Sequence, residues 1–403
     1  MTTLNTLTTD TAKIEAIRAE MPVLQKYVYL NTGTNGPLPR RSHAALVEYA
    51  EQQLTEGRIT MAAWQAYGAS VEGTRAAFAD LLGCAPDEIA LTHNTTEGMN
   101  IGLLGVDWQP GDELITSWTE HEGGLNPAAL LRERFGVKVH YTDIGMPGCD
   151  SVAALQACLN PRVKAVALSH VSWSTGAVLP MRELSALAGS VGALVICDAA
   201  QSCGMVPANV YDLGVDAYAC SGQKWLCGPD GTGALFVRRD SLDRIHQTYT
   251  GYFGVKGHVN RADKPFVPYE GAKRYEAATL YPPSVKALGT SLAWLRDEVG
   301  WDWAFARIRA LAQYAYDRLA ALDDVEMFLP RDQVAGLLHF KVAGIEPADL
   351  TMKLFERDIL IRHTPDPVLN RVATGFYNTE ADIDRLAEAM AQVQAEVVGH
   401  KTE

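Results

Sequence analysis

Apolar and polar residues alternate along the chain with two different periods. Between residues 88 and 237, short apolar runs that end in turn residues predict strands, and the stretches between them have the longer period of amphipathic helices. The predicted strands are 88–92, 112–117, 137–142, 163–168, 193–197, 216–221 and 232–237, and the predicted helices are 99–104, 124–134, 151–159 and 181–190. This alternation favours an α/β fold in which a mostly parallel seven-stranded sheet lies between two layers of helices.

The segments on either side of this region have other patterns. Helices are expected at 11–20, 41–55 and 63–82, with a short strand at 27–30 and an irregular excursion at 251–283. A helical pattern from 283 to 322 leads into strands at 324–329, 335–342, 359–362 and 371–376 and helices at 347–357 and 379–396. We therefore expect an N-terminal arm (1–26) that packs with the small domain, a large domain (27–283) and a small C-terminal α+β domain (284–403).

The composition of the chain argues against some classes of binding partner and indicates a cellular compartment. The chain has 403 residues, of which 47% are hydrophobic and 21% charged, so it can bury a sizeable core. Its net charge of −13 argues against nucleic acid or an anionic membrane as a partner. No apolar run approaches the ~18–20 residues that span a bilayer, and the N-terminus lacks the pattern of a secretory signal. Seven cysteines without close metal-ligand pairs indicate a reducing compartment and no metal site, so we expect a cytoplasmic protein.

Polar side chains follow several predicted strands, where a doubly wound sheet gathers its ligands. Lys224 lies between two strands and is surrounded by apolar and aromatic residues such as Trp225. Desolvation lowers the pKa of a lysine, which suits a lysine that forms a Schiff base, although most lysines are surface charges. The polar turn Asn94–Gly98 precedes a helix, and its Thr95 and Thr96 hydroxyls lie beside free N–H groups. Such a turn binds anions, although an ordinary helix cap has the same residues.

Two further strand ends complete the pattern. His121 follows the strand 112–117 and can stack on a flat ring, although a lone histidine is usually structural or solvated. Asp198 follows the wholly apolar strand 193–197 and is costly to bury unless it meets a cation, such as a protonated pyridine nitrogen. Gln201 can bind an oxygen nearby, and Ser221 offers a hydroxyl to a phosphate. Together with Lys224 these groups specify pyridoxal 5′-phosphate, although none of them does so alone.

The chain also resembles a known family over nearly its whole length. It is similar to the class V, fold-type I pyridoxal-phosphate enzymes, the group of cysteine desulfurases and selenocysteine lyases. Within that group the closer likeness is to L-cysteine/cystine C–S lyases. The segments that carry it are Asn35–Pro39, Leu103–Trp108, Leu168–His170, Thr175–Pro180, Asp198–Ser202, Glu270–Thr279 and Ile361–Pro367.

The resemblance implies roles for individual residues. Lys224 would hold the cofactor covalently and later move the Cα proton of the substrate. Asp198 would pair with the ring nitrogen and Gln201 with the ring hydroxyl, while His121 would stack on the ring. The residues that would bind the phosphate are Thr95, Thr96, Ser221 and Gln223. Thr279 would reach the phosphate in the partner subunit, which implies a homodimer with shared active sites.

Substrate binding is the part of the resemblance that is least complete. Arg362 and Arg371 would take the substrate carboxylate, for which a guanidinium is well shaped, although one of them could be an ordinary interface arginine. Asn35 and Ser174 would also contact the substrate. The family has histidine before its lysine and asparagine before Thr175, where this chain has Gln223 and Ser174. Gln223 can donate to a phosphate but cannot titrate, so we expect cofactor binding to survive and substrate choice to be less secure.

The positions of the cysteines favour one reaction. Desulfurases need a thiolate on a mobile loop of the C-terminal half, but all cysteines lie between Cys84 and Cys227. We therefore expect a C–S lyase that cleaves the Cβ–S bond of cystine or a cysteine S-conjugate by β-elimination, giving a thiol or persulfide, pyruvate and ammonia. The alternatives are a decarboxylating deaminase or aminotransferase acting on such a conjugate, another class V enzyme (desulfurase-like or an epimerase), or a cofactor-free binding protein on the same fold.

Overall fold

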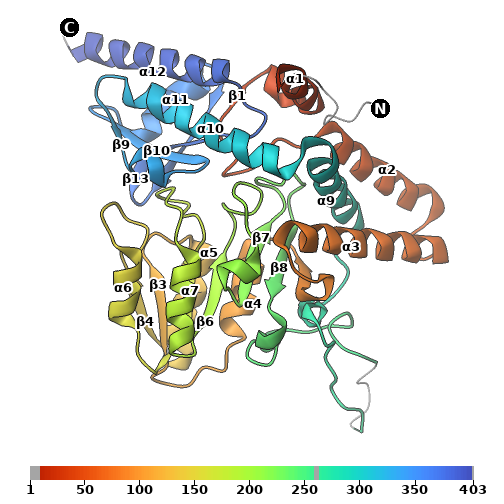
Figure 1. The fold of residues 1–403 in the computed structure, drawn as a ribbon. Coiled ribbons are helices and arrows are strands. Elements are labelled where there is room, and N and C mark those ends of the chain that lie inside the picture. Colours follow the sequence, from red (N-terminus) through yellow and green to blue (C-terminus); the bar gives the residue numbers. More distant parts are fainter. Residues whose placement is uncertain (1–9, 258–262, 402–403) are drawn as a thin grey trace.

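A seven-stranded sheet forms the centre of the protein (Figure 1). In the computed structural model, which describes residues 10–257 and 263–401, its strands lie in the order β2-β8-β7-β6-β5-β3-β4. Neighbouring strands are parallel except that β8 is antiparallel to both β7 and β2. The strands are β2 (Ile89–Thr92), β3 (Glu113–Ser117), β4 (Lys138–Thr142), β5 (Val163–Ser169), β6 (Leu194–Asp198), β7 (Ala217–Ser221) and β8 (Gly233–Val237). All seven predicted strands are present, and the predicted α/β class is confirmed.

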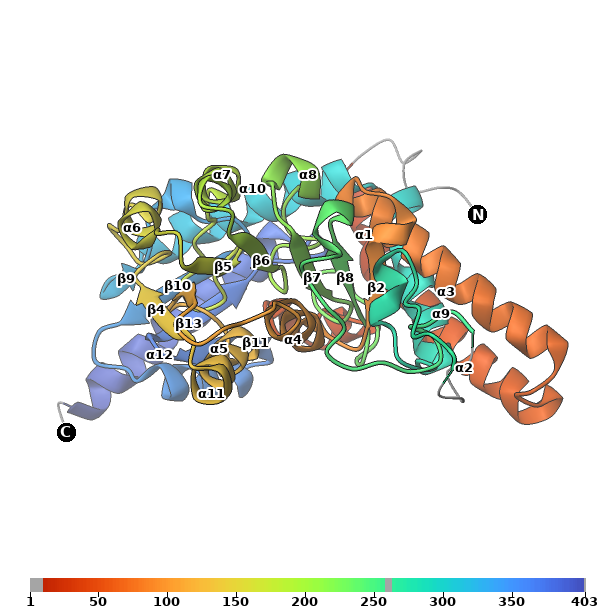
Figure 2. The same cartoon turned by 90° about the horizontal axis from the view of Figure 1, so that it is seen from below.

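Helices cover both faces of this sheet (Figure 2). The alternation along β6 divides its side chains between two cores, with Val195 and Cys197 in one and Leu194 and Ile196 in the other. The first core lies under α6 (Ser151–Cys158), α7 (Met181–Ser190) and α8 (Val210–Leu213), and the second under α4 (Thr95–Leu104) and α5 (Glu122–Phe135). The four-residue helix α8 was not predicted.

The position of α4 matters for the site. The helix begins at Thr95, four residues before the predicted start at residue 99. Gly98 lies against β7 so closely that a Cβ there would come within 2.7 Å of the Cβ of Ala219. This close approach holds the N-terminus of α4 beside the last residues of the central strands.

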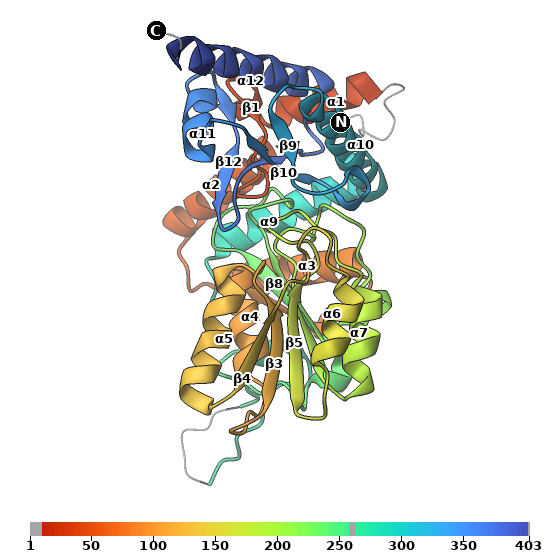
Figure 3. The ribbon, with the colours of Figure 1, turned by 90° about the vertical axis from the view of Figure 1, so that its left-hand side faces the viewer.

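A second, antiparallel sheet lies at one end of the first (Figure 3). Its order is β12-β13-β10-β9, and the strands are β9 (Val325–Met327), β10 (Leu337–Val342), β12 (Arg362–Pro365) and β13 (Val368–Ala373). It packs with α10 (Trp301–Ala320), α11 (Pro347–Phe355) and α12 (Glu380–Lys401). The predicted strand 371–376 begins three residues earlier, as the second arm of the hairpin β12–β13.

The N-terminal segments join the two parts. The pair β1 (Val28–Tyr29) and β11 (Ile359–Leu360) is parallel, and Val28 lies in the core of the C-terminal unit. In α1 (Asp10–Glu20), Arg18 pairs with Asp382 at 2.8 Å. The remaining long helices are α2 (Arg40–Glu56), α3 (Met61–Leu82) and α9 (Pro282–Trp294). The predicted domain boundaries stay a prediction, and β1, expected to open the large domain, pairs with the C-terminal unit.

The excursion at 251–283 is largely irregular, with one short 3₁₀ helix at Ala272–Tyr275. Residues 258–262 of it lie outside the described residues, as do residues 1–9 of the predicted arm. Of the helices in the described ranges, none is both long enough and apolar enough to cross a membrane.

Candidate active site

A cavity of about 210 Å³ lies where the central strands end and the C-terminal sheet begins. It is lined by Asp198, the last residue of β6, and by Arg371 of β13, so both sheets contribute to it. All but three of the predicted site residues line it. The lining residues are Gly33, Thr34, Asn94, Thr95, Thr96, His121, Ser169, Trp173, Asp198, Ala200, Gln201, Ser221, Gln223, Lys224, Arg362 and Arg371.

Lys224 lies in a tightly fixed loop between β7 and β8. The N–H of Gly228 donates to the carbonyl of Gly222 at 2.8 Å, and the N–H of Gly36 donates to the carbonyl of Gln223 at 2.7 Å. A Cβ at Gly36 would lie 2.2 Å from the carbonyl oxygen of Lys224, so only glycine allows this approach. The backbone that carries the lysine is therefore held from both sides.

The surroundings of Lys224 lower its pKa and so raise the fraction of the amine that is neutral. Burial lowers its pKa to about 8, and Arg371 and Arg362 act in the same direction, while Asp198 opposes them. A lysine amine with this pKa is available as a nucleophile and as a base near neutral pH. This is the property that the sequence predicted.

Asp198 and His121 lie in the same cavity as Lys224. The N–H of Ala200 donates to Asp198 Oδ1 at 2.8 Å, and burial raises the pKa of this carboxyl while Lys224 lowers it. His121 Nδ1 accepts the N–H of Gly123 at 3.0 Å, which leaves the proton of a neutral ring on Nε2. Burial, followed by the charge of Lys224, lowers the pKa of His121, so its ring is a neutral, flat surface.

One end of the cavity is shaped for an anion. The hydroxyl groups of Thr95 and Ser221 are buried and have no hydrogen-bond partner among the described residues. Asn94 caps α4 by accepting the N–H of Glu97 at 2.9 Å, so Thr95 and Thr96 occupy the first turn, whose N–H groups have no partner within the helix. Buried hydroxyls without partners are costly, and a phosphate would satisfy them.

Two arginines from the hairpin β12–β13 also line the cavity. Arg371 is buried, its Nε has no partner in the described chain, and its Nη2 donates to Thr34 Oγ1 at 2.9 Å. Arg362 Nη1 donates to the same hydroxyl at 3.3 Å, and its guanidinium lies 5.8 Å from the ring centroid of Trp173. Burial, together with Arg362, lowers the pKa of Arg371 to about 9. No carboxylate of the described residues pairs with either arginine, so the two guanidinium groups are available to an acidic ligand.

The side-chain amide of Gln201 already makes two hydrogen bonds within the protein. Its Nε2 donates to the carbonyl of Gly33 at 2.9 Å, and its Oε1 accepts the indole N–H of Trp225 at 3.1 Å. One amide hydrogen is left for a ligand. The second lone pair of Oε1 is also free, so the predicted contact with a ring hydroxyl can use either group.

Three predicted residues lie outside the cavity. The side chain of Asn35 donates to Asp230 at 3.3 Å, and the buried hydroxyl of Ser174 donates to the carbonyl of Thr119 at 2.9 Å. Thr279 is exposed, and its hydroxyl bonds that of Tyr252 at 2.5 Å. Their proposed contacts with substrate, or with the cofactor of a partner subunit, stay predictions.

The sequence did not single out Thr34, Trp173 or Ser169. Thr34 accepts hydrogen bonds from both arginines and lies in the glycine- and proline-rich loop 31–39. Ser169 donates both its N–H (2.8 Å) and its hydroxyl (2.6 Å) to Glu120, which is buried beside Asp198. Burial raises the pKa of Glu120 to about 8.

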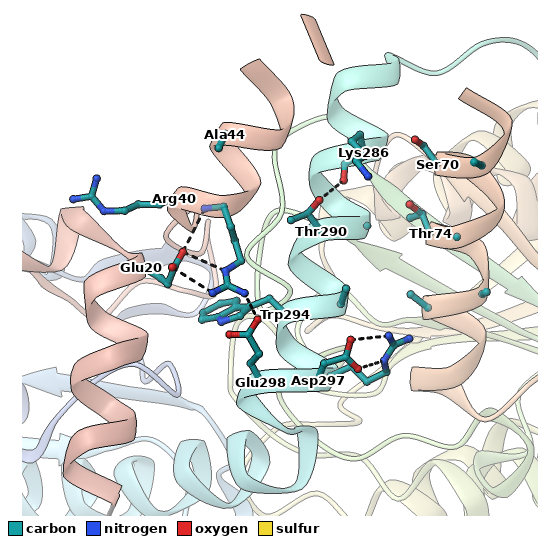
Figure 4. A pocket seen from close by; sticks show the side chains of 18 residues that line it. Glu20, Arg40, Ala44, Ser70, Thr74, Lys286, Thr290, Trp294, Asp297 and Glu298 are labelled. Atoms are coloured by element: carbon teal, nitrogen blue, oxygen red, sulfur yellow. Dashed lines mark hydrogen bonds and ion pairs between the residues drawn. The ribbon is translucent and has the colours of Figure 1, made fainter. Parts of the chain in front are cut away.

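A larger cavity of about 890 Å³ lies between α2, α3 and α9 (Figure 4). Two of its arginines are paired with carboxylates, Arg41 with Glu20 and Glu298 and Arg296 with Asp297. The hydroxyls of Ser70, Thr74 and Thr290 each donate to a backbone carbonyl, so this cavity lacks the buried free hydroxyls of the smaller one. We assign the chemistry to the smaller one.

Comparison with known proteins agrees with this geometry. The family model of aminotransferase class V matches residues 28–386. The cysteine desulfurase of Haloferax volcanii is 28% identical over 94% of this chain and 96% of its own, and the cysteine desulfurase CsdA of Escherichia coli is 32% identical over 93% and 96%. A solved complex of the cystine C–S lyase C-DES with its reaction product cysteine persulfide has a TM-score of 0.88 and 29% identity, covering 92% of this chain and 99% of that one. A C-DES mutant with glycine covalently linked to its PLP cofactor has the same TM-score and identity over 93% and 98%.

The chain belongs to the aminotransferase class V family. Enzymes of this family use pyridoxal 5′-phosphate, and the predicted family, fold type and cofactor are confirmed. The residues present fit that group: Thr95 and Ser221 have free hydroxyls for a phosphate, Asp198 is an acid placed for a ring nitrogen, and Lys224 has a pKa lowered to about 8.

Proposed function

We propose that the protein is a C–S lyase that cleaves the Cβ–S bond of cystine or a cysteine S-conjugate by β-elimination. The products are a thiol or persulfide, pyruvate and ammonia. The similarity to cysteine desulfurases and to a cystine C–S lyase supports a substrate that contains a carbon–sulfur bond. The choice between these two reactions depends on the cysteines.

None of the seven cysteines lines the cavity, and this observation carries the proposal. The one nearest to Lys224 in sequence, Cys227, is fully buried, and burial raises the pKa of its thiol. A desulfurase must bring a thiolate to the substrate sulfur, and a buried thiol with a raised pKa cannot do so. β-Elimination requires no protein thiol.

Some residues of the chain hold the cofactor and the substrate, and Lys224 transfers the proton. When bound, the cofactor supplies an electron sink that makes the Cα proton of the substrate acidic. Thr95 and Ser221 would hold the phosphate, and Asp198 would keep the ring nitrogen protonated. The flat, neutral ring of His121 would pack against the cofactor. Together these contacts would hold the cofactor in place beside Lys224.

Lys224 takes the Cα proton on Nζ, and its lowered pKa keeps a useful fraction neutral for that purpose. Arg371, supported by Arg362, binds the substrate carboxylate and so sets which bond faces Lys224. Loss of the proton forms a double bond between Cα and Cβ as the Cβ–S bond breaks. The sulfur leaves with the electron pair and takes up a proton. Water then converts the released aminoacrylate to pyruvate and ammonia.

The test is to incubate the purified, cofactor-loaded protein with cystine and S-substituted cysteines and to measure pyruvate. We expect pyruvate and ammonia in equal amounts, and loss of both in Lys224→Ala. A 2-oxo acid that keeps its sulfur would indicate transamination, and release of carbon dioxide with an aldehyde would indicate decarboxylating deamination. Either result would overturn the lyase proposal.

We also infer that the enzyme is a homodimer with shared sites. The hairpin of α2 and α3 exposes Leu54, Ile59 and Met61, each with more than 70% of its residue surface accessible. A monomer rarely leaves such a group of apolar side chains in water. Analytical ultracentrifugation tests the inference, because a purely monomeric sedimentation profile would contradict it.

A further inference from the structure

Another cavity, the outer cavity, adjoins the 210 Å³ cavity that contains Lys224, which we call the reaction cavity. It has a volume of about 580 Å³ and lies between α11, the hairpin β12–β13 and the loop after β1. It shares Thr34 and Arg362 with the reaction cavity. Since Arg362 donates to Thr34, this pair forms the wall between the two cavities. The residues that line the outer cavity are Asn31, Thr34, Glu346, Pro347, Ala348, Thr351, Ile361, Arg362, His363, Thr364, Pro365 and Val368.

The size of the reaction cavity leaves little room for a long substrate. Its volume of about 210 Å³ is below the range of roughly 300–1,000 Å³ that is usual for small-molecule sites. It must hold both the cofactor and the reacting carbons of the substrate. Any substituent beyond the sulfur therefore needs space elsewhere, and the outer cavity begins at the arginine that faces the substrate.

The chemistry of the outer cavity suits a zwitterionic group. Pro347, Ile361 and Val368 give it apolar walls, which suit a methylene and a sulfur. Glu346 occupies the N-cap position of α11, but its carboxylate does not cap the helix. That carboxylate is exposed and has no hydrogen bond or ion pair with any residue in the described ranges. Glu346 is therefore a negative group on the cavity wall that is free to bind a cation.

Positive and hydrogen-bonding groups line the same cavity. Arg362 has no carboxylate partner among the residues that the structure describes, and His363 of β12 adds an exposed imidazole. A carboxylate could be bound there while an ammonium group meets Glu346. One half of cystine has this pair of charges next to an apolar CH₂–S arm.

We propose that the outer cavity is a second amino-acid subsite, in which Glu346 binds the distal α-ammonium group of a disulfide substrate such as cystine. This inference rests on the proposed function and specifies its substrate class. It makes Glu346 a specificity-determining residue that does not touch the reacting atoms.

The experiment compares two substrates that differ only at the distal ammonium. One is cystine, and the other is the mixed disulfide of cysteine with 3-mercaptopropanoate, which keeps the disulfide and the distal carboxylate. The ratio of kcat/KM for cystine to that for the mixed disulfide is measured in the native enzyme, in Glu346→Gln and in Glu346→Lys. Glu356→Gln, at the exposed C-terminal end of the same helix, is the matched control.

We expect Glu346→Gln to lower this ratio by about two- to fivefold, as for an ion pair at an exposed site, and Glu346→Lys to lower it further. Glu356→Gln should leave the ratio unchanged. An unchanged ratio in both Glu346 variants, with pyruvate still released, would overturn the subsite and leave the lyase intact. Pyruvate from S-substituted cysteines but from neither disulfide would also overturn the subsite, whereas no pyruvate from any of these substrates would overturn the proposed function itself.

Discussion

The lowered pKa of Lys224 should be visible in the rate at which the protein captures its cofactor. Only the neutral amine attacks an aldehyde, so the rate of loading the cofactor-free protein follows the neutral fraction of Lys224. Burial is the main cause of the shift to about 8, and Arg362 contributes to it.

The magnitude follows from the two pKa values. At pH 7, a pKa of about 8 leaves roughly one Lys224 in ten neutral, whereas the ordinary value of 10.5 would leave roughly one in three thousand. The structure therefore predicts loading at neutral pH that is on the order of 300-fold faster than for an unperturbed lysine in the same position.

The assay mixes cofactor-free protein with excess pyridoxal 5′-phosphate and follows the visible absorbance of the lysine adduct between about pH 6 and 10. The rate should rise about tenfold per pH unit at low pH and level off above about pH 8. Replacing Arg362 with glutamine removes a nearby positive charge, so it should move the midpoint upward. Arg309→Gln, on the exposed face of α10, should not. A rate that still rises tenfold per unit at pH 9 to 10 would show that burial does not lower the pKa of Lys224.

Two further predictions concern cofactor affinity and stability. Ser221→Ala should weaken cofactor binding about 10- to 150-fold in an equilibrium titration, because one hydrogen bond to a charged phosphate is lost. Ser185→Ala removes another buried hydroxyl without a described partner and should have no effect. Asn160, with Arg162 and His140, holds the pKa of Glu113 at about 2, against an ordinary 4.5, although burial opposes them. A depressed pKa stabilises the folded protein above the unfolded-state value, and this stabilisation is lost as pH falls from about 4.5 towards 2. Glu113→Gln should therefore lower the unfolding free energy by about 1–3 kcal/mol near neutral pH. The difference in unfolding free energy between the variant and the native protein should shrink as pH falls over that range. Denaturation curves that give the same difference at every pH would contradict the lowered pKa of Glu113.

The central sheet could be predicted because its signals are local. Each strand carries its own apolar run, and the alternation along β6 already divides Val195 from Ile196, which lie in opposite cores. In a parallel sheet the residues after each strand meet at one edge, so Asp198 and Lys224 could be brought together without knowledge of the packing. The free hydroxyls of Thr95 and Ser221 agree with the predicted anion site.

The substrate side could not be predicted in the same way because it depends on distant contacts. Thr34 meets Arg371 across 337 positions of sequence, and no periodicity encodes that pairing. Ser174 occupies the position of the family's asparagine, and its hydroxyl donates to the carbonyl of Thr119, a contact 55 positions away that no periodicity encodes. The pairing of β1 with β11 is likewise a long-range contact between two short strands.

The carbon product formed from cystine tests the central claim most directly. β-Elimination converts one half of the molecule to pyruvate and leaves the other half as a persulfide of cysteine. Desulfuration would instead leave the carbon skeleton as alanine. We therefore predict that the cofactor-loaded enzyme, given carbon-labelled cystine, yields labelled pyruvate in equal amount to cysteine persulfide. Labelled alanine in place of pyruvate would contradict the account.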